Sequence, residues 1–242
     1  MNKLSKNGKS PLVEEAWQKL ENGFPDDAFE LFNEVLGKSK KDIEALYGRA
    51  SASFLIDEAE KAIKDLTSLL KIDGAHQKAY HLRGLIKGND KKYKEAIKDL
   101  KKAVSLDESN VEALVDLGGA YLVDKDYASA LEVFEKVAKV HNECSDGMRG
   151  MGIAYLFQKK YEKAIDLLGK ALEKDSSDID SLLAIADAYF ATNNPEKGNE
   201  FVKKAKRLKK DVLNKKKKFA DEAELDDQED EDQDILDADF ED

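Results

Sequence analysis

The chain has 242 residues, of which 38% are charged, 41% are hydrophobic and 8% are aromatic, with only three prolines. This composition permits a buried core, and it favours long solvated helices over a β-sandwich or a barrel. The net charge of -11 comes from residues 221–242, which hold fourteen acidic residues and no basic one. The residues before them hold 40 basic and 37 acidic residues and are therefore close to neutral.

Residues 1–8 form a short N-terminal segment that carries positive charge. No apolar stretch of seven or more residues follows it, so no secretory signal is expected. No window approaches the eighteen apolar residues that a membrane span requires. A single cysteine, Cys144, excludes an intramolecular disulfide. These features predict a cytoplasmic protein without a membrane span.

Two series of small residues recur along the chain with a period of 34 residues. One series is Ala16, Ala50, Gly84, Gly118, Gly152 and Ala186, and the other is Ala28, Ala62, Ala96, Ala130 and Ala164. Small side chains allow two antiparallel helices to approach closely, whereas larger ones would force them apart. The period therefore predicts stacked helical hairpins.

The phase of these series divides residues 9–212 into six units. The units are 9–42, 43–76, 77–110, 111–144, 145–178 and 179–212, with no insertion between them. Within a unit, apolar residues recur at steps of three and four, as in 114–124 and in 127–140, and a short polar break separates the two runs. Each unit is thus expected to be a pair of helices. A basic helix extension follows at 213–220, and the acidic tail 221–242 is expected to be disordered.

The unit 111–144 shows the repeat most clearly, with Leu114, Leu117, Gly118, Tyr121, Tyr127, Ala130 and Phe134. This pattern resembles the tetratricopeptide repeat, which has the same 34-residue period. The resemblance implies an all-α, right-handed superhelical solenoid of six tandem helix pairs. The proline that the family often places near the end of a repeat is missing, so the turns are expected to be looser or to be capped in another way. Pro25 and Pro195 are expected to start second helices.

In the family that the chain resembles, the first helix of each pair lines a concave surface that binds partners. Carried over to this sequence, the inward positions are Tyr47, Ser51, His81, Leu85, Glu112, Val115, Asp116, Gly119, Arg149, Ile153, Asp180, Leu183 and Asp187. Acidic and apolar residues dominate this set, which suits a peptide or helix that is both basic and apolar. The alternative is a face that is only solvated.

One branch of the family binds the C-terminal carboxylate of heat-shock chaperones through two lysines, two asparagines and an arginine. The matching positions here hold Val13, Trp17, Gly48, Lys78 and Leu82. We therefore do not expect this chain to be an adaptor that binds the C-terminal tail of heat-shock chaperones. We interpret Trp17 as a packing or edge residue rather than a stacking platform.

The basic run 203–218 holds ten Lys or Arg and one acidic residue. Cations stabilise the C-terminal end of a helix, and the alternatives are a nuclear address or a patch for nucleic acid or acidic lipid. Because Phe219 is the only aromatic residue nearby, nucleic-acid binding is not expected. The acidic tail, with its few hydrophobic residues Ile235, Leu236 and Phe240, is expected either to screen the lysines or to compete for the partner.

No set of residues predicts catalysis, a cofactor or a metal. His141 and Cys144 lie close in sequence, but a structural zinc site needs four ligands. The leading hypothesis is a non-enzymatic scaffold or adaptor that holds a peptide or helix of a protein partner in the concave groove. The alternative is a dedicated chaperone that escorts a basic client, with the acidic tail as a competing or covering element. Self-association through the terminal repeats is a further expectation.

Overall fold

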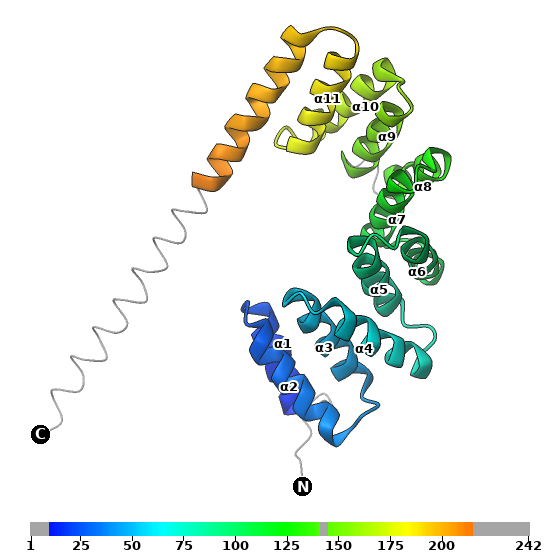
Figure 1. Ribbon diagram of the computed structural model, residues 1–242, viewed down its shortest axis with the longest axis vertical. Coiled ribbons are helices and arrows are strands. Elements are labelled where there is room, and N and C mark those ends of the chain that lie inside the picture. Colours follow the sequence, from blue (N-terminus) through cyan, green and yellow to red (C-terminus); the bar gives the residue numbers. More distant parts are fainter. Residues whose placement is uncertain (1–9, 141–144, 215–242) are drawn as a thin grey trace, which may run out of the picture. The chain divides into compact units, whose positions relative to one another are not determined.

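The computed structural model describes residues 10–140 and 145–214, and these form helices with no strand among them (Figure 1). The helices are α1 (Pro11–Glu21), α2 (Pro25–Lys38), α3 (Ile43–Leu55), α4 (Ala59–Ile72), α5 (Gln77–Asn89), α6 (Tyr93–Leu106), α7 (Val111–Val123), α8 (Tyr127–Val140), α9 (Ser145–Phe157), α10 (Tyr161–Lys174) and α11 (Ile179–Ala191). A last described helix covers 195–214. The predicted all-α fold of paired helices is confirmed.

The helices keep the 34-residue period. First helices from α3 onward begin at Ile43, Gln77, Val111, Ser145 and Ile179, and second helices begin at Pro25, Ala59, Tyr93, Tyr127, Tyr161 and Pro195. Pro25 and Pro195 therefore start second helices as expected, where a missing backbone N–H is tolerated. Most of the predicted basic extension, all of the acidic tail, and His141 and Cys144 lie outside the described residues.

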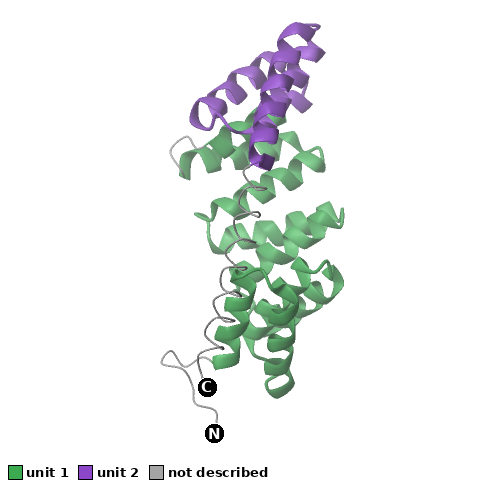
Figure 2. Ribbon diagram, turned by 90° about the vertical axis from the view of Figure 1, so that its left-hand side faces the viewer, with its two compact units in different colours: residues 1–154 green, residues 155–242 purple. Residues whose placement is uncertain are grey.

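The chain forms two compact units, residues 1–154 and 155–242 (Figure 2). In the first unit each helix from α1 to α7 packs against the next one, and successive first helices, α1, α3, α5 and α7, also touch. In the second unit α10 packs against α11, and Tyr189 stacks on Phe201 of helix 195–214 at 5.8 Å. No helix in the described part of the chain is long and apolar enough to cross a membrane. The division of the sequence into domains stays a prediction.

The small residues of the repeat lie where helices cross. Ala16, Ala28, Ala50 and Ala62 are buried without residual exposure. At Gly118 of α7, an added Cβ would lie 2.5 Å from the ring of Phe134 on α8, which is closer than a real contact allows. The glycine therefore sets the distance between these two helices.

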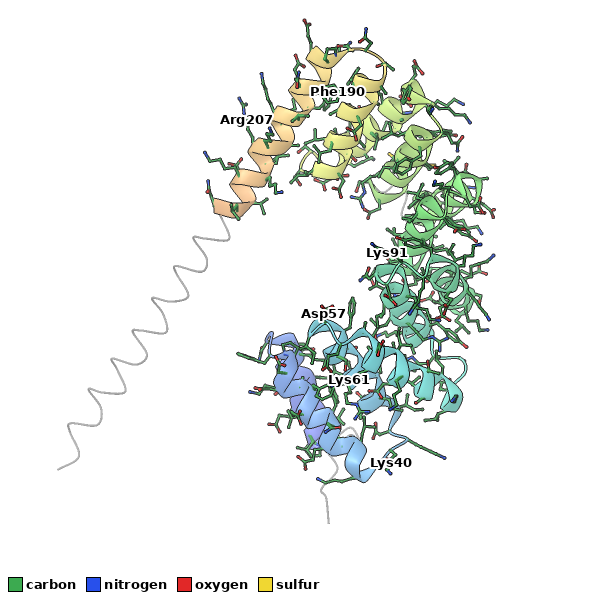
Figure 3. All side chains as sticks on the ribbon, in the orientation of Figure 1. Lys40, Asp57, Lys61, Lys91, Phe190 and Arg207 are labelled. Atoms are coloured by element: carbon green, nitrogen blue, oxygen red, sulfur yellow. The ribbon has the colours of Figure 1, made fainter. Side chains whose placement is uncertain are left out.

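The turn inside each hairpin contains one residue in the left-handed backbone conformation. These residues are Gly23, Asp57, Lys91, Lys125, Lys159 and Asn193, with φ between 59° and 82°. They too recur every 34 residues, and Figure 3 labels Asp57 and Lys91. This conformation costs a non-glycine residue about 1–2 kcal/mol. Five of the six turns have a non-glycine residue at this position. Packing of the two helices that each turn joins fixes its backbone conformation and offsets this cost.

The turns between pairs are capped by side chains in place of the family's proline. Asp42, His76, Asn110 and Asp178 each accept a hydrogen bond from a backbone N–H three residues further on, at 2.8–3.2 Å. Such caps satisfy donors that the first turn of a helix leaves open. Of the two expectations for these turns, the structure shows the second, capping in another way.

Two arginines on first helices each bond to the second helix that precedes them and to the second helix that follows them, where the acceptor is an aspartate. Arg49 of α3 donates to Asp65 of α4 at 2.7 and 2.8 Å and to Asn33 of α2 at 2.7 Å. One repeat further on, Arg83 of α5 donates to Asp99 of α6 at 2.8 and 2.7 Å and to Thr67 of α4 at 3.2 Å. Planar guanidinium groups suit this bidentate arrangement.

The Asp99 carboxylate is the most strongly bonded member of these pairs. It also accepts a hydrogen bond from Lys87 at 2.9 Å, and its side chain is 5% exposed. Burial alone would raise the pKa of Asp99, but the hydrogen bonds from Arg83 and Lys87 outweigh burial and lower it. Asp99 is thus held ionised although little of its side chain is exposed to solvent.

A matched pair of glycine substitutions tests the crossing distance. Gly118→Ala should destabilise the chain by about 1–3 kcal/mol, because Phe134 must move. Gly119→Ala, in the same helix but with nothing beyond the local helix backbone within 4 Å of the new methyl group, should stabilise it by about 0.5–1 kcal/mol. Thermal unfolding followed by far-UV circular dichroism measures both. Equal shifts in Tm would contradict the packing explanation.

A second prediction concerns Asp99. Asp99→Ala should cost about 3 kcal/mol, because it leaves the Arg83 charge buried without its partner. The double variant Arg83→Leu/Asp99→Val installs the residues found one repeat later, Leu117 and Val133, and should stay within about 1 kcal/mol of the parent. Urea unfolding measures both variants. If the double variant is as unstable as the single one, the pair itself stabilises the fold.

Candidate protein-binding surface

The first helices of the first unit line a groove at α1 and α3. The groove has a volume of ≈ 1030 Å³, and its lining residues are Glu14, Trp17, Gln18, Glu21, Ile43, Glu44, Tyr47, His76 and Lys78. We call it the aromatic groove. It spans the first three repeats, because His76 and Lys78 lie at the start of α5.

The aromatic rings of this groove form a row that is anchored in the core. Trp17 packs edge-on against the fully buried Phe32 at 5.3 Å and faces Tyr47 at 6.0 Å. Tyr47 in turn lies 5.5 Å from His76, whose Nδ1 accepts a hydrogen bond from the backbone of Ala79 at 3.1 Å. Because each ring rests on a fixed neighbour, the row is preformed. Preformed aromatic surfaces bind at a low cost in side-chain entropy.

The charge of the aromatic groove is predominantly negative. Glu14, Glu21 and Glu44 line it, against one lysine, Lys78. Burial raises the pKa of Tyr47, and the Glu112 carboxylate of α7 raises it further, although Ser51 partly opposes the shift. Tyr47 therefore keeps its proton and can donate a hydrogen bond.

A second contact on the first helices joins α5 to α7. His81 Nε2 lies 2.7 Å from a carboxylate oxygen of Asp116, and the two side chains are 17% and 33% exposed. The contact orients both side chains and leaves part of the carboxylate open to solvent.

The thirteen residues predicted to face a partner all lie on first helices. Tyr47 and Ser51 are on α3, His81 and Leu85 on α5, Glu112, Val115, Asp116 and Gly119 on α7, Arg149 and Ile153 on α9, and Asp180, Leu183 and Asp187 on α11. The structure brings together His81 with Asp116, and Arg149 pairs with Asp146 of the same helix at 2.5 Å. The three α11 residues are exposed and belong to the other unit. Their role in binding stays a proposal.

The sequence interpretation missed several residues of the aromatic groove, although the period could have found them. Trp17 lies 34 residues before Ser51, so it shares the phase of a predicted inward position. Glu44 and Lys78 share the phase of Glu112 in the same way. Trp17 does pack against the core as predicted, but it also lines the groove. His76 carried no such signal, because it is a helix cap.

The only tryptophan in the chain, Trp17, reports directly on the charge of this groove. Iodide should quench its fluorescence weakly relative to neutral acrylamide, because nearby carboxylates repel the anion. Glu14→Gln/Glu21→Gln should raise the iodide-to-acrylamide ratio, and about 1 M salt should remove the difference. The control Glu135→Gln/Glu173→Gln makes the same charge change on exposed positions of α8 and α10. If both double variants raise the ratio equally, the groove has no local negative field.

Comparison with known proteins gives a family and a fold. A profile of the tetratricopeptide repeat matches residues 90–147 and 155–212. No curated protein matches the chain. A Pseudomonas aeruginosa protein, pilF, matches the structure with a TM-score of 0.68 at 18% identity, over 81% of this chain and 90% of that chain.

Two further solved structures share the fold. A MamA protein matches with a TM-score of 0.63 at 23% identity, over 69% of this chain and 91% of that one. YrrB, described as a TPR protein with an unusual peptide-binding site, matches with a TM-score of 0.58 at 21% identity, over 77% and 97%. At these identities the likeness concerns the fold alone. The profile match, together with the helix pairs of period 34, identifies the chain as a member of the tetratricopeptide-repeat family.

Proposed function

We propose that this protein is an interaction scaffold that holds a basic peptide or helix of a partner protein against its first helices, with the aromatic groove as the main anchor. The observation that carries the proposal is the row Trp17, Tyr47 and His76 inside a groove with three glutamates. Family membership supports the general role of a scaffold, and peptide binding by YrrB is a property of that protein with the same fold.

The chemistry of the groove matches a lysine or arginine side chain. A cation over the face of Trp or Tyr gains about 0.5–2 kcal/mol, and more as water is excluded. The aliphatic stem of such a side chain can cover Ile43, while its charge lies among Glu14, Glu21 and Glu44. A neutral or acidic peptide would bring no positive charge to these carboxylates.

A face that is merely solvated would look different. Trp17 and Tyr47 are half-buried and fixed by neighbours, whereas solvated helix faces of this chain carry exposed lysines and glutamates in i,i+4 pairs, such as Glu34 with Lys38 at 2.6 Å. Large aromatic residues held in a groove are typical of the energetically dominant positions in interfaces.

Affinity capture with the full-length chain, followed by binding of a peptide from the captured protein, tests the proposal. Trp17 emission should change as the peptide binds, and Trp17→Phe should weaken binding about tenfold, followed by calorimetry, because Trp is the better cation–π partner and gives more contact area. Glu14→Gln/Glu44→Gln should weaken it severalfold and reduce its salt dependence. The control Glu135→Gln/Glu173→Gln should bind as the parent does.

A captured peptide that is not basic, or one whose affinity is unchanged in both groove variants, would reject the proposal. Deleting 221–242 separates the two forms of the function. A single basic client that is lost with the tail would indicate an escort chaperone. A partner retained without the tail would indicate an adaptor.

A further inference from the structure

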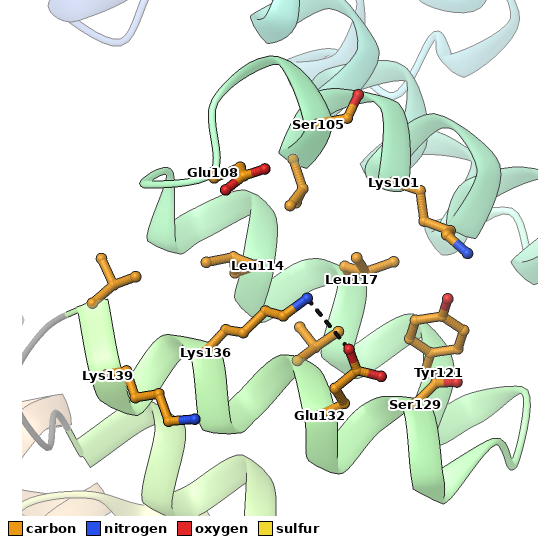
Figure 4. Close-up of a pocket in the computed structure, with 13 residues that line it drawn as sticks. Lys101, Ser105, Glu108, Leu114, Leu117, Tyr121, Ser129, Glu132, Lys136 and Lys139 are labelled. Carbon is orange, nitrogen blue, oxygen red and sulfur yellow. Dashed lines mark ion pairs between the residues drawn. The ribbon is translucent and has the colours of Figure 1, made fainter.

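A second groove lies on α6, α7 and α8, away from the residues predicted to bind a partner. Its volume is ≈ 580 Å³. Val104, Leu114, Leu117, Val133 and Val140 give it an apolar floor, and Tyr121 stands at one end (Figure 4). We call it the α6–α8 groove.

The groove opens where a repeated ion pair is missing. Between α2 and α4 the bridging residues are Asn33, Arg49 and Asp65, and between α4 and α6 they are Thr67, Arg83 and Asp99. The residues 34 positions further on are Lys101, Leu117 and Val133. An aliphatic pair thus replaces the guanidinium and the carboxylate at the third junction. The hollow at the first junction, which Arg49 and Asp65 line, has a volume of only ≈ 220 Å³.

Part of the apolar surface of this groove is uncovered. Leu117 and Val133 are buried at the bottom, but Val104 is half-buried and Val140 is 44% exposed. An apolar floor flanked by charged residues is typical of a peptide-binding groove.

The charged residues that line the α6–α8 groove have a net charge of +1. The groove carries Lys101, Lys136 and Lys139 against Glu108 and Glu132. Lys136 pairs with Glu132 at 3.4 Å, as the dashed line in Figure 4 shows. Among the residues that the structure describes, Lys101 and Lys139 form no ion pair. These two lysines flank the apolar floor on α6 and α8.

We propose that the α6–α8 groove binds an acidic peptide of a partner protein, which places apolar side chains over Leu117 and Val133 and carboxylates beside Lys101 and Lys139. This goes beyond the role proposed above, because the site lies largely on second helices and selects the opposite charge. Opposite charge selection keeps one peptide from competing for both grooves. The scaffold can therefore hold two different segments.

Selection of displayed random twelve-residue peptides on the full-length protein tests this site. Peptides that also bind the variant Leu117→Arg/Val133→Asp, which installs the ion pair of the preceding repeats, are removed from the selected pool. The remaining peptides, which bind the parent but not this variant, should be acidic and carry at least two large apolar residues. Their synthetic forms should bind the parent with Kd in the micromolar range and bind this variant at least tenfold more weakly, by fluorescence anisotropy.

A second variant is needed because the first changes two buried residues and could prevent folding. Lys101→Glu/Lys139→Glu changes only exposed side chains and should also weaken binding at least tenfold, whereas Lys98→Glu/Lys170→Glu, on exposed positions of α6 and α10, should leave it within twofold. Selected peptides that are basic or uncharged, or that bind all these variants equally, would overturn the proposal. A groove that binds only the chain's own residues 226–242, included as a labelled peptide, would also overturn it.

Discussion

Close approach of helices at small residues is the constraint on which the rest of this structure depends. Phe134 shows it most directly, because added Cβ atoms at Gly118 and at Gly150 would lie 2.5 and 2.2 Å from its ring. With both neighbours reduced to backbone, the ring can fill the space between α7, α8 and α9. Repetition of this packing every 34 residues fixes the phase of each helix. That phase decides which residues face the core and which face a partner.

A fixed phase also explains why two surfaces of the first unit differ. On the first helices, one phase places Trp17, Ser51 and Leu85 in line, and a neighbouring phase places Tyr47 and His81 in line. On the other side, Arg49 and Arg83 close the spaces between second helices, and Leu117 at the same phase leaves one open. Single substitutions within a regular repeat therefore create local sites without altering the fold. Repeat proteins tolerate this because each unit contacts only its neighbours.

The period made most of the fold predictable from the sequence. Small residues at two phases predicted the helix pairs, and the same phase, applied to residue 17, would have predicted the groove position of Trp17. Other features could not be predicted. The left-handed turns at Asp57 and Lys91 carry no glycine signal, because tertiary packing overrides local preference there. The Arg49–Asp65 pair joins residues on different helices, so the sequence alone does not reveal it. The groove at Leu117 can be explained only after this pair is known, because Leu117 occupies the position of the arginine two repeats later.

The central claim is that a partner binds the first helices through the aromatic groove. Hydroxyl-radical footprinting of the full-length chain, with and without its captured partner, tests this most directly, because aromatic side chains report their solvent exposure by oxidation. The account predicts that the partner protects Trp17 and Tyr47, while Tyr93 of α6 and Tyr161 of α10 oxidise as in the free chain. Protection of Tyr93 or Tyr161, with Trp17 and Tyr47 unchanged, would contradict it.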